Sequence, residues 1–266
     1  MPKVSANGIT INYAVQGTGD PLVLIPFLTA DHACYTFQVE AYSKHFTCIS
    51  LDPRGAGETD SPAGVYSTEL FADDVAAFMQ AIGVDRAHVA GLSLGAAVGM
   101  WLAAKYPGRV RSLSLHSGCA KADPFVQTVL RGWQIMAKAL GSVPETVCTA
   151  LFPWCLTPEL YAEKPEYVEA LAAFVRQRPA QTVSAFMQQS DAIMAHDAEA
   201  QLGRISAPTQ LTFGRSDMLT SIRFADQLKA GIAGAELVVF DRAAHAAIFE
   251  QVDEFNRQTL AFLQRH

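Results

Sequence analysis

The sequence Gly91-Leu92-Ser93-Leu94-Gly95 joins a mostly apolar run, His88 to Leu92, to a segment with helical spacing of apolar residues, Leu94 to Lys105. A short apolar run of this kind is typical of a strand buried on both faces of a sheet. A strand that turns directly into a helix must bend sharply, and only small neighbours such as the two glycines avoid collisions at the bend. The pattern predicts a nucleophile elbow, in which the Ser93 hydroxyl stands above the carboxyl edge of a sheet and beside a helix N-terminus.

Other short apolar runs alternate with helix-like segments along most of the chain. Strands that alternate with helices imply βαβ connections, and hence an α/β fold with a mostly parallel, twisted sheet covered by helices on both faces. Near the N-terminus, Asn7-Gly8 predicts the two-residue turn of a β-hairpin. The remaining expected strands are Pro21–Ile25, Phe46–Leu51, Val110–Leu115, Thr209–Phe213 and Glu236–Phe240, and the remaining expected core helices are Leu70–Ile82, Ile222–Ala230 and Val252–Leu263.

The alternation stops between residues 124 and 205. This stretch has helical apolar spacing and is rich in proline and aromatic residues. We expect it to be a helical cap, or lid, inserted into a core domain formed by residues 1–123 and 206–266. Its aromatic content suggests an apolar pocket, with Trp133, Phe152 and Trp154 as candidate lining residues. For most of these aromatic residues, packing between the cap helices is the simpler explanation.

Composition narrows the range of functions. The 266 residues suit one large α/β domain, alone or with an insertion. Half of the residues are hydrophobic and 17% are charged, so the chain can bury a large core. The net charge of −6, without a dense lysine and arginine block, disfavours nucleic acid and acidic membranes as partners. No run reaches about 18 uncharged apolar residues, so we expect no membrane-spanning segment.

Cysteine usage and the N-terminus point to the cytoplasm. The five cysteines are odd in number and contain no Cys-x-x-Cys pair, which disfavours a disulfide scaffold or a zinc ribbon. The first residues lack the basic-then-apolar layout of a signal peptide. We find no metal-ligand spacing, phosphate-binding loop or dinucleotide-binding glycine motif, so we expect chemistry without a metal or cofactor. Monomer and homodimer both remain open.

A serine hydroxyl is a weak nucleophile until a base takes its proton. Among seven histidines, His245 stands out because it follows the last expected strand, Glu236–Phe240, and precedes the final helix. Loops at the carboxyl ends of parallel strands are where such sheets gather reactive groups. The remaining histidines lie in or at the ends of strands, on the surface or in the cap. Taken alone, His245 is as readily explained by a structural role.

A base of this kind needs a carboxylate that orients the imidazole and stabilises its charged form. Asp217 follows the expected strand Thr209–Phe213 by a short turn, although an aspartate there could also be a helix cap. The chain order Ser93, Asp217, His245 is the order expected when a nucleophile elbow belongs to a Ser-His-Asp triad. Three such residues, each just after a separate strand, predict a catalytic triad.

With these residues the chain resembles the α/β-hydrolase fold family nearly from end to end. Asp52-Pro53-Arg54-Gly55-Ala56-Gly57-Glu58-Thr59 resembles the family turn Asp-x-Arg-Gly-x-Gly-x-Ser, in which we expect Arg54 to tie loops together. That segment, the Ser61–Tyr66 stretch after it and the stretch from Gly91 to Ala103 are similar to 3-oxoadipate enol-lactonases. A looser resemblance to N-acyl homoserine lactone lactonases also exists. The resemblance implies a small-molecule ester or lactone as substrate.

The segment after the third strand departs from the family pattern. Many members carry His-Gly where this chain has Pro26-Phe27. The oxyanion hole needs two converging backbone N–H groups, and one is expected from Leu94. Alignment with the family pattern assigns the second to Leu28, with Phe27 less favoured, while Pro26 has no N–H to donate. Phe27, where glycine is usual, is also expected to reshape the pocket floor and contact substrate.

The sequence therefore favours a serine esterase or lactonase that works through an acyl-enzyme. The serine at the elbow argues against haloalkane dehalogenases and epoxide hydrolases, which use a carboxylate there. Carbon–carbon bond hydrolysis and cofactor-free perhydrolysis on the same triad remain alternatives, as does a receptor-like protein with negligible turnover. An enol-lactone acid would need a basic partner. The cap supplies four candidates, for which a solvated surface is the simpler role: Arg131, Lys138, Arg176 and Arg178.

Overall fold

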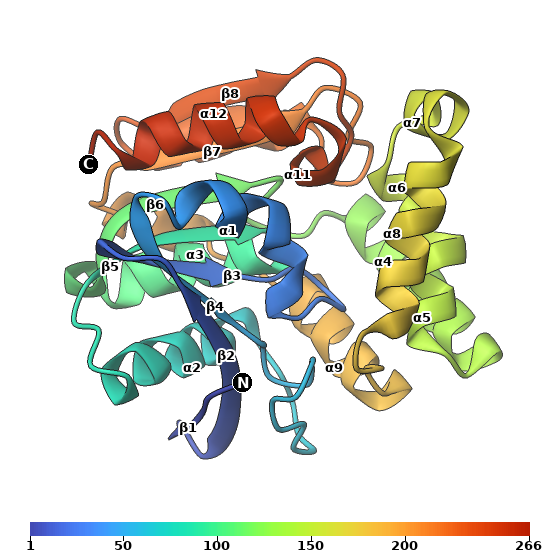
Figure 1. Ribbon diagram of the computed structural model, residues 1–266, viewed down its shortest axis with the longest axis horizontal. Helices are drawn as coiled ribbons and strands as arrows, with labels where there is room; N and C mark the ends of the chain where they lie inside the picture. The colour runs from blue at the N-terminus through green and yellow to red at the C-terminus, as the bar shows by residue number, and fades with distance from the viewer.

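A twisted sheet of eight strands forms the centre of the protein, as the computed structural model of residues 1–266 shows (Figure 1). The strand order is β1-β2-β4-β3-β5-β6-β7-β8. The β1–β2 and β2–β4 pairs are antiparallel, and every other pair is parallel. The strands are β1 (Lys3–Ala6), β2 (Ile9–Gln16), β3 (Asp20–Ile25), β4 (Phe46–Leu51), β5 (Ala87–Leu92), β6 (Val110–His116), β7 (Thr209–Gly214) and β8 (Glu236–Phe240).

The expected α/β fold with a mostly parallel sheet is confirmed, and the expected strands agree with the observed ones to within a residue at each end. The hairpin between β1 and β2 turns at Asn7 and Gly8, with φ of 46° and 75°. Positive φ at both central residues is what this kind of hairpin turn requires, and asparagine and glycine tolerate it best.

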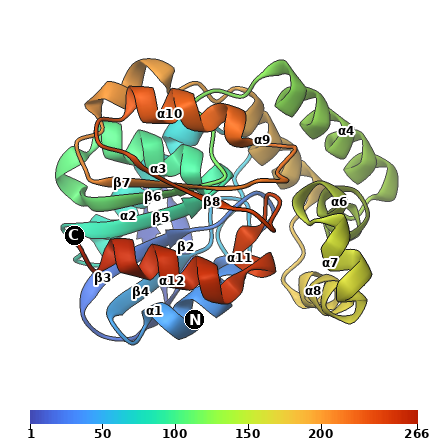
Figure 2. The same cartoon turned by 90° about the horizontal axis from the view of Figure 1, so that it is seen from above.

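Helices cover both faces of the sheet (Figure 2). One face carries α1 (Thr36–Tyr42), α11 (Ala247–Glu250) and α12 (Val252–Leu263), and the other carries α2 (Thr68–Ala81), α3 (Leu94–Lys105) and α10 (Ala225–Gly231). Nearly all of α3 is buried, because it packs against the sheet on one side and α2 on the other. This explains why α3 is apolar around most of its circumference.

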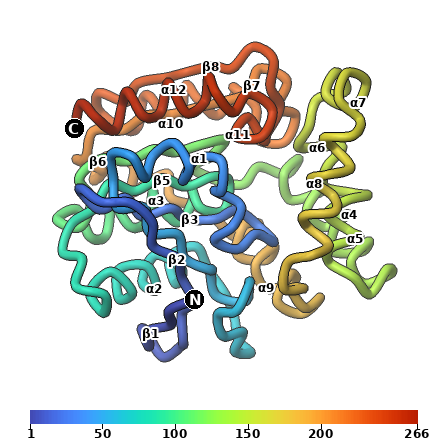
Figure 3. Tube along the Cα trace, in the orientation of Figure 1, coloured from blue at the N-terminus to red at the C-terminus, as the bar shows by residue number.

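Between β6 and β7 the chain leaves the sheet and forms a group of helices at one end of the molecule (Figures 1 and 3). Pro158 and Pro165 each stand at the start of a helix, where a missing N–H and a fixed φ are favourable. We propose residues 124–205 as the cap and the rest of the chain as the core. The cap helices are α4 (Pro124–Leu140), α5 (Val143–Thr146), α6 (Phe152–Cys155), α7 (Pro158–Glu163), α8 (Pro165–Gln177) and α9 (Val183–Met194).

The turn after β4 is fixed by buried polar contacts. The Asp52 carboxylate accepts hydrogen bonds from the side chains of Asn12 and His32. Arg54 donates two hydrogen bonds, of 2.8 and 2.6 Å, to Asp74 of α2. At Gly57, φ is 55° and a Cβ would lie 2.2 Å from an Asp52 oxygen, so only glycine fits. Arg54 thus ties a loop to a helix, in agreement with the expected structural role.

None of the helices combines the length and the apolar character that a membrane crossing would need.

We expect Asp74→Ala to lower the free energy of unfolding by about 3–5 kcal/mol, because it leaves the Arg54 charge buried without a partner. The side chains of Arg54 and Asp74 are only 8% and 3% exposed. Asp73→Ala is the matched control, since Asp73 bonds the partly exposed side chains of Lys105 and Tyr106, and its loss should cost about 1 kcal/mol. Urea denaturation measures both values. Equal losses in the two variants would contradict the assigned role of the Arg54–Asp74 pair.

Candidate active site

Ser93 occupies a strained turn between β5 and α3, with φ of 55° and ψ of −109°. Its N–H donates to the carbonyl of His116 at the end of β6, which holds the turn against the sheet. A Cβ at Gly91 would lie 2.2 Å from the carbonyl oxygen of Gly95, and one at Gly95 would lie 2.1 Å from that of Ile25. Any side chain at either position would therefore collide with the backbone, so both residues must be glycine. The positive φ at Ser93 is the strain expected of a functional residue.

His245 and Asp217 form a buried hydrogen-bonded pair. Nδ1 of His245 lies 2.9 Å from Oδ2 of Asp217. The other Asp217 oxygen accepts the N–H groups of Leu219 and Thr220, at 2.8 and 2.9 Å. Burial raises the pKa of Asp217, but the charge and hydrogen bonds of His245 and the bonds from Thr220 outweigh it and hold the pKa below its usual value. An ionised Asp217 accepts a hydrogen bond from Nδ1–H of His245, which leaves Nε2 free to act as a base.

Two further residues brace this pair and were not identified from the sequence. The Ser117 hydroxyl donates to the carbonyl oxygen of His245 at 3.0 Å. The Thr220 hydroxyl lies 2.8 Å from the carbonyl oxygen of Ser117 and 3.0 Å from Oδ2 of Asp217. Ser117 directly follows β6, the strand beside the elbow. That position was the available signal, but serine after a strand is too common to single it out.

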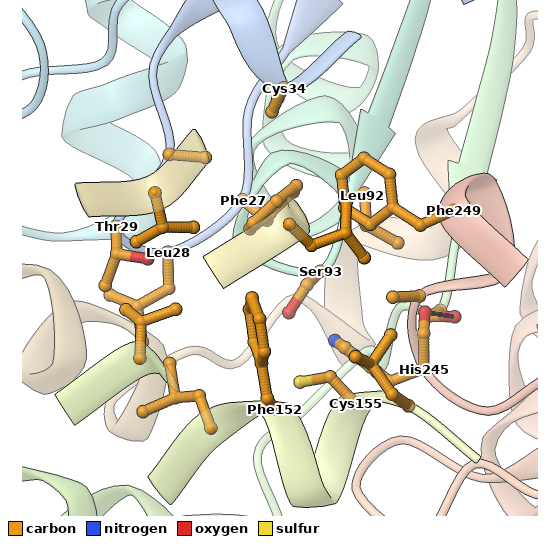
Figure 4. Close-up of a pocket in the computed structure, with 18 of the residues that line it drawn as sticks. Phe27, Leu28, Thr29, Cys34, Leu92, Ser93, Phe152, Cys155, His245 and Phe249 are labelled. Atoms are coloured by element: carbon orange, nitrogen blue, oxygen red, sulfur yellow. Dashed lines mark hydrogen bonds between the residues drawn. The ribbon is translucent and has the colours of Figure 1, made fainter. Parts of the chain in front are cut away.

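Ser93 and His245 come from distant parts of the chain and line one cavity. Figure 4 shows the Ser93 hydroxyl and a ring nitrogen of His245 facing the same space, with the Cys155 thiol beside them. No hydrogen bond joins the Ser93 and His245 side chains in this structure. Such bonds are commonly long or poorly aligned without a ligand and shorten when substrate binds.

Three other buried histidines are already committed to hydrogen bonds. His88 and His116 each bond a hydroxyl on the neighbouring strand, of Ser112 and Thr212. His196 bonds the hydroxyl of Thr68 and a backbone carbonyl. Burial lowers the pKa values to about 4 for His88, about 3 for His116 and about 4 for His196. These rings are uncharged at neutral pH and serve packing, which leaves His245 as the candidate base.

Of the two residues expected to provide the oxyanion hole, Leu94 directly follows Ser93, and Leu28 lines the same cavity as Ser93. The Leu28 N–H makes no backbone hydrogen bond, and Leu94 begins α3, where an N–H has no partner within its own helix. Thr29 follows with φ of 72°, and its N–H lies 3.4 Å from Oε1 of Gln189. Gln189, fully buried in α9, also donates to the carbonyl of Arg54 at 2.8 Å. The cap thus fixes the turn that carries Leu28.

The cavity has a volume of about 380 Å³, and most of its walls are apolar. Phe27, Trp133 and Phe152, which the sequence analysis proposed as substrate-contacting residues, line it. In Figure 4, Phe27 and Phe152 flank the space in front of Ser93. A volume of this size and character suits a small apolar ligand.

Trp154, the fourth proposed contact residue, lies outside the cavity. Its ring instead packs edge-on against Phe125 of α4, with the ring centres 5.9 Å apart. The neighbouring Cys155 does line the cavity (Figure 4). The short helix α6 therefore turns one aromatic residue, Phe152, toward the cavity and the other toward a cap neighbour.

One group of residues has the donor set of a metal site. The ligand atoms of Asp31, His32 and Asp52 lie within 4.8 Å of one another. Asp52, however, bonds His32 and other partners, and Asp31 bonds Arg178 and the Ala33 N–H. These bonds account for the cluster without a metal ion, and none of its members is part of the Ser93–His245 arrangement.

Comparisons with known proteins agree with this geometry. A model of the alpha/beta hydrolase fold family matches residues 20–252. A protein of Azorhizobium caulinodans, provisionally named a carbamate hydrolase, is 29% identical over 98% of this chain and 98% of its own. A 2-hydroxy-6-oxo-6-phenylhexa-2,4-dienoate hydrolase of Burkholderia cepacia is 30% identical over 90% of this chain and 79% of its own. The enol-lactonase structure from Burkholderia xenovorans LB400 matches with a TM-score of 0.89 and 26% identity, over 99% of this chain and 100% of its own.

We expect an organic fluorophosphonate, which phosphonylates activated serines, to label the wild-type protein at Ser93. Ser93→Ala should remove the label, and His245→Gln should slow labelling by about a thousandfold or more, since the base is lost. Ser184→Ala, on the exposed side of α9, is the control and should label at the wild-type rate. Peptide mass spectrometry locates the label. Full labelling of Ser93→Ala would exclude Ser93 as the nucleophile.

We expect Gln189→Leu to slow this labelling by about tenfold to a hundredfold, because the turn carrying Leu28 loses its support. Gln188→Leu is the matched control, since Gln188 directly precedes Gln189 and its side chain bonds only the surface carbonyl of Gly64. Stopped-flow fluorescence measures the second-order rates, and thermal melts of both variants report any loss of fold. If Gln189→Leu labels as fast as Gln188→Leu, Gln189 has no part in positioning the oxyanion loop.

Proposed function

The chain belongs to the alpha/beta hydrolase fold family, and on this basis we propose that it is a serine hydrolase that cleaves carboxylic esters or lactones through an acyl-enzyme. The observation that carries the proposal is the bonded His245–Asp217 pair, whose histidine lines one apolar cavity with Ser93 at its strained turn. An enol-lactonase among the structural relatives adds support.

In the proposed mechanism Nε2 of His245 takes the proton of Ser93 as the hydroxyl oxygen attacks the ester carbonyl. The backbone N–H groups of Leu28 and Leu94 stabilise the negative oxygen of the tetrahedral intermediate. His245 then protonates the departing alkoxide, and Asp217 stabilises the transient imidazolium. A water molecule, deprotonated by the same histidine, releases the acid from Ser93. When the substrate is a lactone, acid and alcohol leave as one hydroxy acid.

Carbon–carbon bond hydrolysis is the second candidate, and one observation favours it. The Burkholderia cepacia relative, at 30% identity, is named for a substrate with a ketone and a dienol acid but no ester. Hydrolysis of such a compound must break a carbon–carbon bond. The same three side chains could serve this reaction through nucleophilic attack or proton transfer.

We expect kcat/KM for straight-chain p-nitrophenyl esters to rise by up to about fourfold for each added methylene, because burial of one methylene contributes about 0.8 kcal/mol. The rise should stop when the chain fills the cavity. Phe152→Ala should shift the preferred length, whereas Tyr161→Ala, which is exposed on α7 and outside the cavity, should not. Steady-state assays from acetate to decanoate give the profile.

The same assays should include lactones of several ring sizes and a vinylogous diketone. Cleavage of the diketone alone, identified by product analysis, would replace the ester proposal with carbon–carbon hydrolysis. A flat profile over chain length would show that the acyl group does not enter the apolar cavity.

A further inference from the structure

The cavity contains one cationic and one anionic side chain that carry fixed charge, and they are paired with each other. Of the four cap cations considered as partners for an acidic substrate, only Arg178 lines the cavity. Its Nε donates to Oδ2 of Asp31 at 2.8 Å. Asp31 lies three residues beyond Leu28, so the pair joins the loop of the oxyanion hole to the cap segment after α8.

Asp31 is held in place independently of Arg178. Its side chain is 5% exposed, and its second oxygen accepts the N–H of Ala33 at 2.9 Å. A second buried carboxylate, Asp52, stands behind it. Burial raises the pKa of Asp52, but hydrogen bonds from His32, Glu58 and Asn12 outweigh burial and hold the pKa below its usual value. The guanidinium of Arg178 therefore pairs with a fixed carboxylate, which has a second carboxylate close to it.

The rest of the cavity offers no compensating positive charge. Its walls are apolar apart from short hydroxyl and amide groups and two histidines. His196 is uncharged at neutral pH, since burial lowers its pKa to about 4. A carboxylate carried into this cavity would lose its water and find its one cation already neutralised. Such a group is costly to bury without a free partner.

We infer that Asp31 and Arg178 set the charge specificity of the site, so that it takes esters or lactones with an uncharged, apolar arm and rejects those whose arm ends in a carboxylate. This rests on the proposed function, because the arm belongs to an ester bound at Ser93. The inference also excludes enol-lactone acids as substrates, because they carry a free carboxylate. Asp31 is the specificity-determining residue, because it withholds Arg178 from the substrate.

The test compares matched pairs of substrates. In one series a terminal carboxylate replaces the terminal methyl of the acyl arm of p-nitrophenyl esters, from four to ten carbons. In a second series the same exchange is made on the alcohol arm of acetate esters. For the wild-type enzyme we expect kcat/KM to favour the uncharged member by about tenfold or more in the series whose arm reaches the pair.

Asp31→Asn is the decisive variant, because asparagine can still accept the Ala33 N–H but leaves Arg178 unneutralised. We expect the ratio of kcat/KM for carboxylate esters to kcat/KM for uncharged esters to rise by about tenfold. Adding Arg178→Gln should cancel the gain. Arg176→Gln is the control, since Arg176 pairs with Glu145 on the surface and does not line the cavity.

A binding measurement separates this inference from the proposed function. Calorimetry of wild-type protein with octanamide and with suberic acid monoamide compares uncharged and carboxylate ligands of equal length without any turnover. If no ester is cleaved but octanamide binds more tightly, the esterase proposal fails and the charge inference stands. A wild-type preference for carboxylates in both assays would overturn the inference. So would an Asp31→Asn protein that is folded by circular dichroism yet keeps the wild-type preference.

If Asp31→Asn does not fold, Arg178→Gln alone still decides. It should lower kcat/KM for carboxylate esters more than for uncharged esters of the same length, because Asp31 then faces the cavity alone. The contrary result is a wild-type enzyme that prefers carboxylate esters and an Arg178→Gln variant that loses kcat/KM for those esters alone. It would mean that Arg178 binds the substrate directly, against the inference.

Discussion

The turn at Ser93 is the constraint on which the rest of the site depends. Its left-handed backbone costs about 1–3 kcal/mol, and it persists because β5 is paired on both sides and α3 is packed against the sheet. The two flanking glycines leave the backbone room to pass. As a result the hydroxyl is held at the carboxyl edge of the sheet, at the N-terminus of α3, where negative charge is favoured.

The strand order then decides which loops supply its partners. β3 and β6 lie on either side of β5, so the end of β3 abuts the elbow, and the residue after β6, Ser117, braces the histidine. β7 and β8 follow in the sheet, and they supply Asp217 and His245. The cap closes the remaining side. Through Gln189 it also holds the turn that carries Leu28, and through Arg178 it pairs with Asp31, three residues beyond Leu28.

The sheet, the core helices and the place of the elbow could be predicted from sequence patterns, because buried parallel strands are short apolar runs. Each candidate catalytic residue follows one of these runs. The cap was harder, because aromatic residues at helical spacing fit both packing and pocket lining. Phe152 faces the cavity and Trp154 does not, although only one residue, Pro153, separates them. Likewise, nothing local distinguishes Arg178 from Arg176. Its role depends on Asp31, about 150 residues away in the chain but 2.8 Å away in space.

The most direct test of the account is a crystal structure of the protein with an alkyl boronic acid, which forms a tetrahedral adduct with an activated serine. The account predicts a bond from boron to the Ser93 oxygen, with one boronate oxygen about 2.7–3.1 Å from the backbone nitrogens of both Leu28 and Leu94. Nε2 of His245 should hydrogen-bond the adduct, and the alkyl chain should lie in the apolar cavity. A boronate bound elsewhere, or one on Ser93 whose oxygens reach neither amide, would contradict it.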